Sequence, residues 1–372
     1  MKKIIALLLA VIMMFGLVAC GSADQTPDET PAQNTENVKP SGNETSDGEE
    51  TGTVMYTDSL GREVEVPAKI TRIVPSAPLG QMYLYALCPE LFVGTADEWN
   101  EEFRAFMAES YPDLPVVGQL YGGKGELNLE TLAMTEPQVI IDVGEAKKGT
   151  AEELDGLQEQ LNIPCVHISA DMKTAGEAFR ELGRFLGLEE RAEVLAAYCE
   201  NAYAEITGLM ETVGEENKKS ILYCPGADGL NVIGKGSYHA EVIDMIGDNA
   251  AVLENPSSKG IGDSVDSEQV TLWNPEVIFF SPEVNLEEVV ADPAWGELSA
   301  IKSGNYHKAP EGPYNWMGFP PSVNRYLGMY WMASILYPDQ AQFDLYDKVS
   351  EYYDLFYHVE MTPEYFNELT GK

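Results

Sequence analysis

The chain has 372 residues, of which 44% are hydrophobic, and this is enough for a large core and for two domains. Its 61 acidic residues outnumber its 23 basic residues, so the formal net charge is -38 at pH 7. Because such a surface repels phosphate groups, the composition argues against nucleic acid as a partner.

The first 20 residues have the pattern of a secretory signal peptide. Lys2 and Lys3 precede an apolar run over residues 4–19, which is too short to span a bilayer as a helix. The run ends in LVAC and is followed by a glycine. This resembles the bacterial lipobox, in which the cysteine receives a diacylglycerol and becomes the new N-terminus. The resemblance implies lipidation at Cys20 and a location on the extracytoplasmic face of the cell membrane. An ordinary signal peptide with a chance cysteine is the alternative.

Residues 21–55 are predicted to be a disordered acidic tether. The segment is rich in Ser, Thr, Pro, Gly, Asn, Asp and Glu and has few large apolar side chains. Such a composition cannot bury enough surface to fold. As a flexible coil, the segment would reach roughly 30 Å on average.

Short apolar strands alternate with helices over residues 56–170, which we interpret as an N-terminal lobe. The expected strands are RIVPS, LFVGTA, PVVG, QVIIDVG and PCVHIS. Strands that are apolar almost throughout and are separated by helices predict a parallel sheet that is covered on both faces.

A helical stretch follows, for which we expect one long interlobe helix over residues 171–215, with GLEER at residues 187–191 as the point where it would bend. Short apolar strands again alternate with helices over residues 216–372, which we predict to be a C-terminal lobe. There SILYCPG and LNVIGKG flank Ala-Asp-Gly, which is a hairpin signal. The end of the chain is predicted to be helical over residues 321–336 and 340–357, with Pro321 in the first turn.

One short sequence pattern occurs twice in the chain. LNLETLAMTEPQVIID and SEQVTLWNPEVIFF each contain a glutamate, a helical run, a proline and a strand. Glu130 precedes Pro137 by the same distance as Glu268 precedes Pro275. A carboxylate near a helix N-terminus is favoured by capping and by the helix dipole. Asp or Ser would cap equally well, however, and capping does not fix the distance to the proline.

These segments together resemble the class III substrate-binding proteins of bacterial ABC importers, which deliver iron–siderophore, haem or cobalamin complexes. The resemblance covers residues 56–337 and also rests on TDSLGREVEVPAKITRIV and PPSVNRYLGMYWMASILYP. It implies an α/β fold with two lobes, each a mostly parallel sheet covered by helices, joined by one long rigid helix, with a ligand cleft between the lobes. It further implies a monomeric binding protein, not an enzyme, whose Glu130 and Glu268 dock on the two subunits of an ABC permease that works with its ATPase subunits.

Ligands of open α/β sheets bind beyond the carboxyl ends of the strands. The candidate ligand-binding residues on this rule are Ser76, Trp99, Tyr121, Asp142, Tyr238, Tyr314, Trp316 and Arg325. We expect Arg325 on a helix surface, within reach of an anionic ligand. The set is aromatic and has few cations, so it favours a bulky metal chelate, first a ferric siderophore of low charge, then a corrinoid, then haem. No cofactor besides this ligand is expected, and the four scattered histidines do not favour a metal site on the protein itself.

A two-lobed cleft enzyme, such as a metal chelatase or a hydrolase, is the alternative function. The sequence has no G-x-S-x-G elbow, no zinc-ligand spacing and no P-loop to support it. A surface-structural lipoprotein is a third possibility, but it leaves the repeated glutamates unexplained. The remaining cysteines form no C-x-x-C pair and are expected to be buried thiols, although the sequence cannot settle whether a disulfide joins any of Cys88, Cys165, Cys199 and Cys224.

Overall fold

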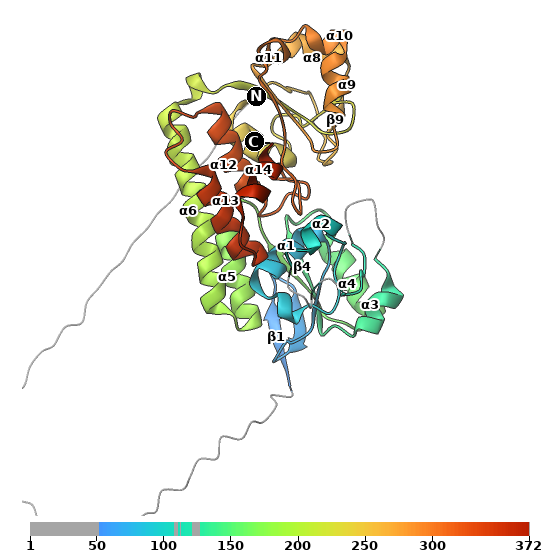
Figure 1. Ribbon diagram of the computed structural model, residues 1–372. Coiled ribbons are helices and arrows are strands. Elements are labelled where there is room, and N and C mark those ends of the chain that lie inside the picture. Colours follow the sequence, from blue (N-terminus) through green and yellow to red (C-terminus); the bar gives the residue numbers. More distant parts are fainter. Residues whose placement is uncertain (1–51, 108–110, 112, 121–126, 372) are drawn as a thin grey trace, which may run out of the picture. The chain divides into compact units, whose positions relative to one another are not determined.

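The computed structural model of the chain describes residues 52–107, 111, 113–120 and 127–371 (Figure 1). The signal peptide with Cys20, nearly all of the tether and Tyr121 lie outside the described residues. The expectations for them therefore stay predictions. The predicted end of the tether at residue 55 is wrong, because residues 53–55 belong to a strand, β1 (Thr53–Thr57), that pairs with β2 (Glu63–Pro67). Among the described helices, none has the length and the apolar character needed to cross a bilayer.

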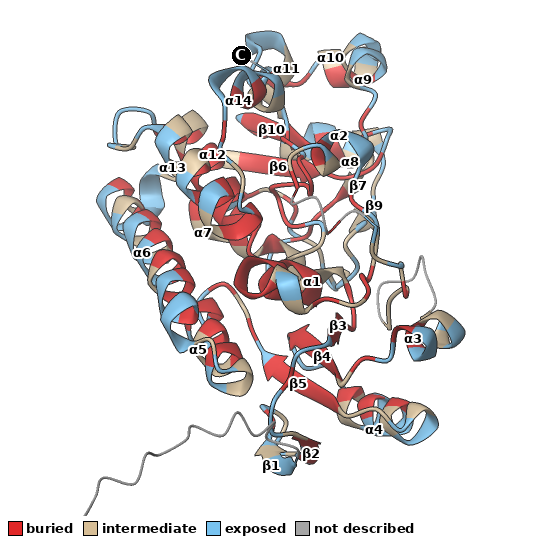
Figure 2. Ribbon diagram, turned by 60° about the horizontal axis from the view of Figure 1, so that its bottom comes forward, coloured by how far each residue is buried: buried red, intermediate tan, exposed pale blue. Residues whose placement is uncertain are grey.

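The N-terminal lobe is built on a parallel sheet in the order β3-β4-β5. Every residue of β3 and β4 is buried, as expected for strands that are covered on both faces (Figure 2). The runs LFVGTA and PVVG, which we expected to be strands, contribute only isolated bridges. The elements of this lobe are the antiparallel pair β1 (Thr53–Thr57) and β2 (Glu63–Pro67), then β3 (Ile73–Pro75), α1 (Pro78–Leu87), η1 (Pro89–Leu91), α2 (Glu101–Arg104), α3 (Leu129–Thr135), β4 (Val139–Gly144), α4 (Thr150–Leu161) and β5 (Cys165–Ser169).

The helical stretch between the two sheets is broken, so the prediction of one helix over residues 171–215 is wrong. Helix α5 (Ala175–Leu186) ends at Gly187, whose φ of 71° lies in the left-handed region that glycine adopts most readily. Helix α6 (Glu189–Val213) begins two residues later and packs along α5 (Figure 1). The single long helix that leads to the second sheet is therefore α6, which has 25 residues.

The C-terminal lobe contains a second parallel sheet, in the order β11-β10-β6-β8. The hairpin that we predicted around Ala-Asp-Gly is wrong, because β7 pairs antiparallel with β9 instead of with β6. The elements are η2 (Glu215–Asn217), β6 (Ser220–Cys224), β7 (Asn231–Val232), η3 (Tyr238–Ala240), α7 (Glu241–Ile246), β8 (Asp248–Asn249), β9 (Asp263–Ser264), α8 (Ser267–Trp273), β10 (Val277–Phe280), α9 (Leu286–Ala291), α10 (Pro293–Gly296), α11 (Ser299–Ser303) and β11 (Tyr306–Lys308).

The last helices return to the first lobe. Helix α12 (Arg325–Leu336) starts at Arg325, so Pro321 precedes it and is not in its first turn. It is followed by α13 (Leu345–Tyr352), the π-helical turn η4 (Tyr353–Tyr357) and α14 (Pro363–Thr370). The turn η4 packs against α1. The largest core cluster accordingly contains side chains from both sheets and from the C-terminal helices, and it joins the two lobes.

Candidate ligand-binding site

The two lobes meet at the carboxyl ends of the first sheet. The hydroxyl of Ser322 donates a hydrogen bond of 3.2 Å to the carbonyl of Leu79, which lies just after β3. The hydroxyl of Tyr326 donates one of 2.6 Å to the carbonyl of Met172, which lies just after β5. Since ligands of open α/β sheets bind beyond the carboxyl ends of the strands, this junction is the candidate site.

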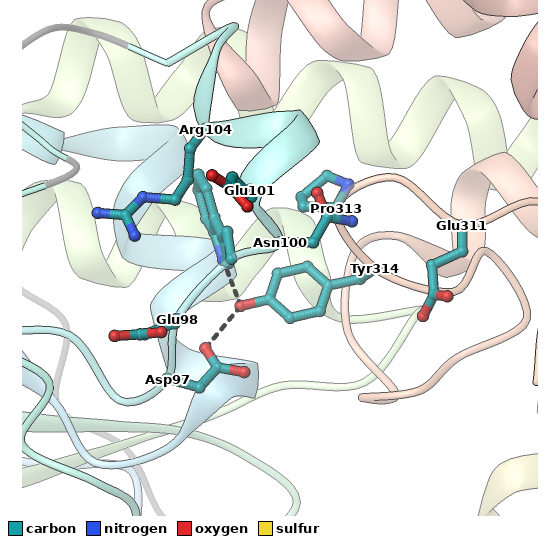
Figure 3. A pocket seen from close by; sticks show the side chains of 9 residues that line it. Asp97, Glu98, Asn100, Glu101, Arg104, Glu311, Pro313 and Tyr314 are labelled. Atoms are coloured by element: carbon teal, nitrogen blue, oxygen red, sulfur yellow. Dashed lines mark hydrogen bonds between the residues drawn. The ribbon is translucent and has the colours of Figure 1, made fainter.

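A pocket of about 760 Å³ opens at the junction. Its walls come from both lobes and consist of Asp97, Glu98, Trp99, Asn100, Glu101, Arg104, Glu311, Pro313 and Tyr314 (Figure 3). Among these described residues, four carry a carboxylate and one carries a guanidinium. The electrostatics of this pocket therefore favour a neutral or cationic ligand over an anionic one.

A hydrogen-bonded network joins the lobes at the edge of this pocket. The indole Nε1 of Trp99 donates to the hydroxyl of Tyr314 at 2.5 Å, and that hydroxyl donates to Oδ1 of Asp97 at 2.9 Å (Figure 3). The amide of the buried Gln81 donates to the same carboxylate oxygen at 3.0 Å. Burial raises the pKa of Asp97 to about 6, although both hydrogen bonds oppose the rise.

Three of the aromatic side chains that we expected to contact the ligand, Trp99, Tyr314 and Trp316, are buried, whereas Tyr238 is half-buried. Trp99 contacts Tyr85 edge to face, with ring centroids 4.6 Å apart, and also packs against Tyr357 of η4. Trp99 and Tyr314 are buried but still line the pocket. Trp316 is fully buried, so its ring offers no accessible face to a ligand. The C-terminal helices that cover these rings are the physical reason for the difference.

A second group of polar side chains surrounds Arg325. Its side chain is 2% exposed, so it does not lie on the helix surface where we expected it. Its Nη1 lies 2.7 Å from Oε2 of Glu241, as an ion pair without the alignment of a hydrogen bond. Its guanidinium carbon is 5.6 Å from the ring centroid of Tyr238, within the range of a cation–π contact. Burial raises the pKa of Glu241, and the charge of Arg325 opposes that rise.

Charged groups from the first lobe also reach this cluster. Burial lowers the pKa of His239, and the positive charges of Arg325 and Lys147 lower it further. Burial raises the pKa of Tyr238, and Glu145 adds to this rise. Since Glu145 and Lys147 follow β4, the cluster lies at the carboxyl ends of the first sheet and includes residues of both lobes.

Ser76 and Asp142, which we expected to contact the ligand, are engaged with each other inside the first lobe. The Ser76 hydroxyl donates a hydrogen bond to Oδ1 of Asp142, whose Oδ2 lies 2.7 Å from Nδ1 of His167. All three side chains are buried and connect β3, β4 and β5. The aspartate stands between the serine and the histidine, which differs from a hydrolase triad, where the histidine contacts the serine.

Sequence reasoning missed four candidate site residues: Asp97, Gln81, Glu241 and Glu311. Asp97 could have been predicted from the rule that ligands bind beyond the ends of strands, because it directly follows the expected strand LFVGTA. Gln81 and Glu241 lie in or at the start of helices and become part of the site only through long-range packing. No local pattern marks them.

The two helices that carry the repeated glutamates have the same construction. Glu130 and Glu268 are exposed at the second positions of α3 and α8. The caps are other side chains: Asn128 accepts from the amide of Thr131, and Asp266 accepts in the same way in α8. Capping therefore does not require either glutamate.

The cysteines that follow the signal peptide are buried and unpaired: Cys88, Cys165, Cys199 and Cys224. Burial raises the pKa of the Cys165 thiol to about 12. Within the part of the chain that the structure describes, no group of three or more His, Cys, Asp or Glu side chains is arranged to hold a metal ion.

Known proteins resemble this chain over most of its length. It is 26% identical over 336 residues to the molybdate-binding protein MolA of Haemophilus influenzae, a match that covers 83% of this chain and 92% of the relative. It is 23% identical over 220 residues to the Fe(3+)-citrate-binding protein YfmC of Bacillus subtilis, which covers 58% of this chain and 66% of the relative.

Solved structures show the same fold. An ABC transporter solute-binding protein from Sulfurospirillum deleyianum superposes with a TM-score of 0.77 at 27% identity, over 86% of this chain and 99% of the other. Molybdate-bound MolA of Haemophilus influenzae superposes with a TM-score of 0.65 at 21% identity, over 83% of this chain and 99% of the other.

The family described as periplasmic binding protein matches residues 103–311, which is more than half of the chain. Its members and the relatives above are extracytoplasmic solute-binding transport proteins, not enzymes, and they work with a permease and ATPase complex. The chain therefore belongs to the periplasmic binding protein family, in its class III group of ABC-transporter solute-binding proteins.

Proposed function

We propose that the chain is the lipid-anchored substrate-binding protein of an ABC importer, attached through Cys20 and docking on the permease through Glu130 and Glu268. The LVAC sequence after an apolar run supports the anchor. The two exposed glutamates support the docking, because a permease built of two like subunits offers the same surface twice.

The ligand that we propose is a compact, oxygen-rich anion that contains a metal, held between the lobes at Arg325. Molybdate and ferric citrate, named for the two relatives above, share this chemistry. The position of Arg325 is the observation that carries the proposal, because its guanidinium faces Glu241 and Tyr238, two half-buried side chains at the junction of the lobes. A guanidinium is the side chain best suited to oxyanions, and here it is withdrawn from water at the carboxyl ends of the strands. We place it before our first expectation of a bulky chelate, because three of the rings expected to contact such a ligand, Trp99, Tyr314 and Trp316, are buried.

An anion at this position must compete with Glu241, the present partner of Arg325. Because burial raises the pKa of Glu241, its carboxylate accepts a proton more readily than an exposed one. Once Glu241 is neutral, the guanidinium is free to pair with the ligand. Binding of the anion is therefore coupled to proton uptake, and affinity should increase as the pH falls.

Calorimetric titration of the purified protein with molybdate, tungstate, sulfate and ferric citrate tests the proposal. Arg325→Gln should weaken the tightest of these by about 10- to 100-fold, the range expected for hydrogen bonds to a charged group. Arg104→Gln, which changes a cation in the acidic pocket, is the matched control and should leave the affinity unchanged. Equal affinity in Arg325→Gln and wild type would refute the site. If Arg325→Gln does not fold, Arg325→Lys provides the test, because it keeps the charge beside Glu241 but lacks the paired donors of the guanidinium, so it should also weaken binding.

The acidic pocket supports a second candidate ligand, a chelate of low or positive charge. Its volume of about 760 Å³ lies within the usual range for small-molecule sites, and Trp99 and Tyr314 line it. A ferric siderophore comes first here, then a corrinoid, then haem. Titration with ferrioxamine B, a positively charged ferric siderophore, distinguishes the two candidates. Quenching of tryptophan fluorescence that is lost in Glu311→Gln, without any response to the anions, would favour the chelate.

A further inference from the structure

Helices α3 and α8 resemble each other in more than their glutamates, because other equivalent positions also share residue type and burial. At a constant offset of 138 residues, Glu130 corresponds to Glu268, and Pro137 to Pro275. Between them, Leu132 and Val270 correspond and are both buried, whereas Met134 and Leu272 correspond and are both exposed. Each helix ends in a left-handed residue directly before the proline, Glu136 in α3 and Asn274 in α8.

Met134 and Leu272 are 76% and 78% exposed, the two highest values among the large hydrophobic side chains of the described residues. The next are Val252 at 68% and Met55 at 61%. A single exposed apolar side chain is normal and needs no explanation. Here, however, the two most exposed ones occupy equivalent positions in two helices of different lobes, which chance exposure does not explain.

The apolar side chain and the glutamate lie on the same face of each helix. They are four residues apart, which places them one above the other along the helix. The buried Leu132 or Val270 lies between them in sequence and points to the opposite, inner face. The N-terminal caps and the left-handed residues at the C-termini fix both ends of α3 and α8. Each lobe thus presents a rigid pair of one acidic and one apolar side chain.

We propose that Met134 and Leu272 are apolar contacts for the permease, each inserting into an apolar recess of one subunit beside the basic residue that receives the neighbouring glutamate. This rests on the proposed docking through Glu130 and Glu268. A partner that offers two like surfaces matches two like pairs on one chain. A second copy of this chain would set carboxylate against carboxylate. An anionic lipid surface would repel a chain of formal charge -38.

The apolar contact should contribute more affinity than the charge. Full burial of a Met or Leu side chain is worth about 10- to 100-fold in a binding constant, whereas an exposed ion pair is worth roughly one- to fivefold. The glutamates would then chiefly steer the encounter and set its orientation. Met134 and Leu272 would hold the complex together.

The test uses the cognate importer in lipid nanodiscs and the concentration of the binding protein that half-maximally stimulates its ATPase. Met134→Ser and Leu272→Ser should each raise this concentration about tenfold, and the double variant should raise it further. Val252→Ser and Met55→Ser are the matched controls, because they remove comparably exposed apolar side chains outside α3 and α8, and they should change it less than twofold. All four positions are exposed, so thermal stability should be unaffected.

The paired Glu130→Ala, Glu268→Ala variant separates this inference from the proposed docking. If that variant is impaired and the Met134 and Leu272 variants are not, the apolar contact is refuted while the docking stands. If only the apolar variants are impaired, the contact stands and the docking by glutamate fails. A photo-crosslinking amino acid at position 134 should label a membrane subunit. Labelling of a second copy of the chain, or of lipid in empty nanodiscs, would overturn the proposal.

Discussion

Neutralising Asp97 should make the folded chain more stable at neutral pH. Asp97→Asn keeps an oxygen that accepts from Tyr314 and from Gln81, the two side chains that donate to Oδ1. The substitution therefore removes the charge while it preserves the hydrogen bonds between the lobes. Glu98→Gln is the control, because Glu98 lines the same pocket but is exposed.

The size of the effect follows from the pKa of Asp97, which burial raises from its ordinary value of 3.8 to about 6. The folded chain holds the proton more tightly than the unfolded chain, so the protonated carboxyl contributes stability that is lost as the pH rises from about 4 through about 6. Each pKa unit corresponds to about 1.4 kcal/mol, so the full loss is about 3 kcal/mol. Between pH 4.5 and pH 7.5 it amounts to about 2 kcal/mol.

Urea unfolding at pH 4.5, 6.0 and 7.5 measures this effect as the difference in the free energy of unfolding between Asp97→Asn and wild type. The difference should increase in favour of the variant by about 2 kcal/mol between pH 4.5 and pH 7.5. For Glu98→Gln it should stay constant within about 0.5 kcal/mol. A constant difference for Asp97→Asn, or one that shifts toward wild type as the pH rises, would refute the reasoning.

Three further predictions concern other parts of the chain. Cys20→Ala should shift the protein from the membrane to the soluble fraction or block its processing, and normal processing with membrane retention would rule out the lipobox. Glu241→Gln should tighten molybdate binding at pH 7.5 and abolish its pH dependence in calorimetry, because burial raises the pKa of this carboxyl and only its neutral form releases the guanidinium. Gly247→Ala should lower the free energy of unfolding by about 1–3 kcal/mol, since its Cβ would overlap Cδ1 of Ile221. Gly156→Ala, in an open position of α4, should instead raise it by about 0.5–1 kcal/mol, and equal effects of the two substitutions in urea unfolding would contradict the packing argument.

The sheet framework could be predicted because its determinants are local. QVIIDVG, PCVHIS and EVIFF are apolar runs bounded by prolines or polar residues, and each forms a buried parallel strand. The α/β class follows from the alternation of such runs with helices. The comparisons with known proteins confirm the two-lobed fold.

The sequence does contain residues that indicate the break between α5 and α6, but the helical periodicity on both sides favoured a single helix. Gly187 is a typical residue after a helix end, and Glu189 and Glu190 are typical of a first helical turn. Apolar residues at helical spacing on both sides of the break favoured one continuous helix. A reversal of direction leaves that spacing unchanged within each helix, so periodicity alone cannot detect it.

The ligand site was harder to predict because it depends on which surfaces become covered. Trp316 stands among glycines and prolines, which is typical of an exposed loop residue, yet it is fully buried. Arg325, at the start of an apolar helix, is inside the junction and not on its surface. Both outcomes result from packing against segments distant in sequence, for Arg325 against Glu241 and Tyr238, and no window of sequence around either residue contains that information.

An acidic chain that binds an anion faces repulsion from its own charge. At physiological ionic strength this repulsion is screened beyond about 8 Å, so short-range groups at the site decide whether the anion binds. A buried cation without a partner would destabilise the empty protein, and Glu241 prevents this by pairing with Arg325 at 2.7 Å. If the proposed anion binds at Arg325, the same pairing would exclude anions that interact too weakly to displace a carboxylate. Selection of the ligand at this junction would then depend less on the shape of a preformed pocket than on the strength with which an oxyanion competes with Glu241 for one guanidinium.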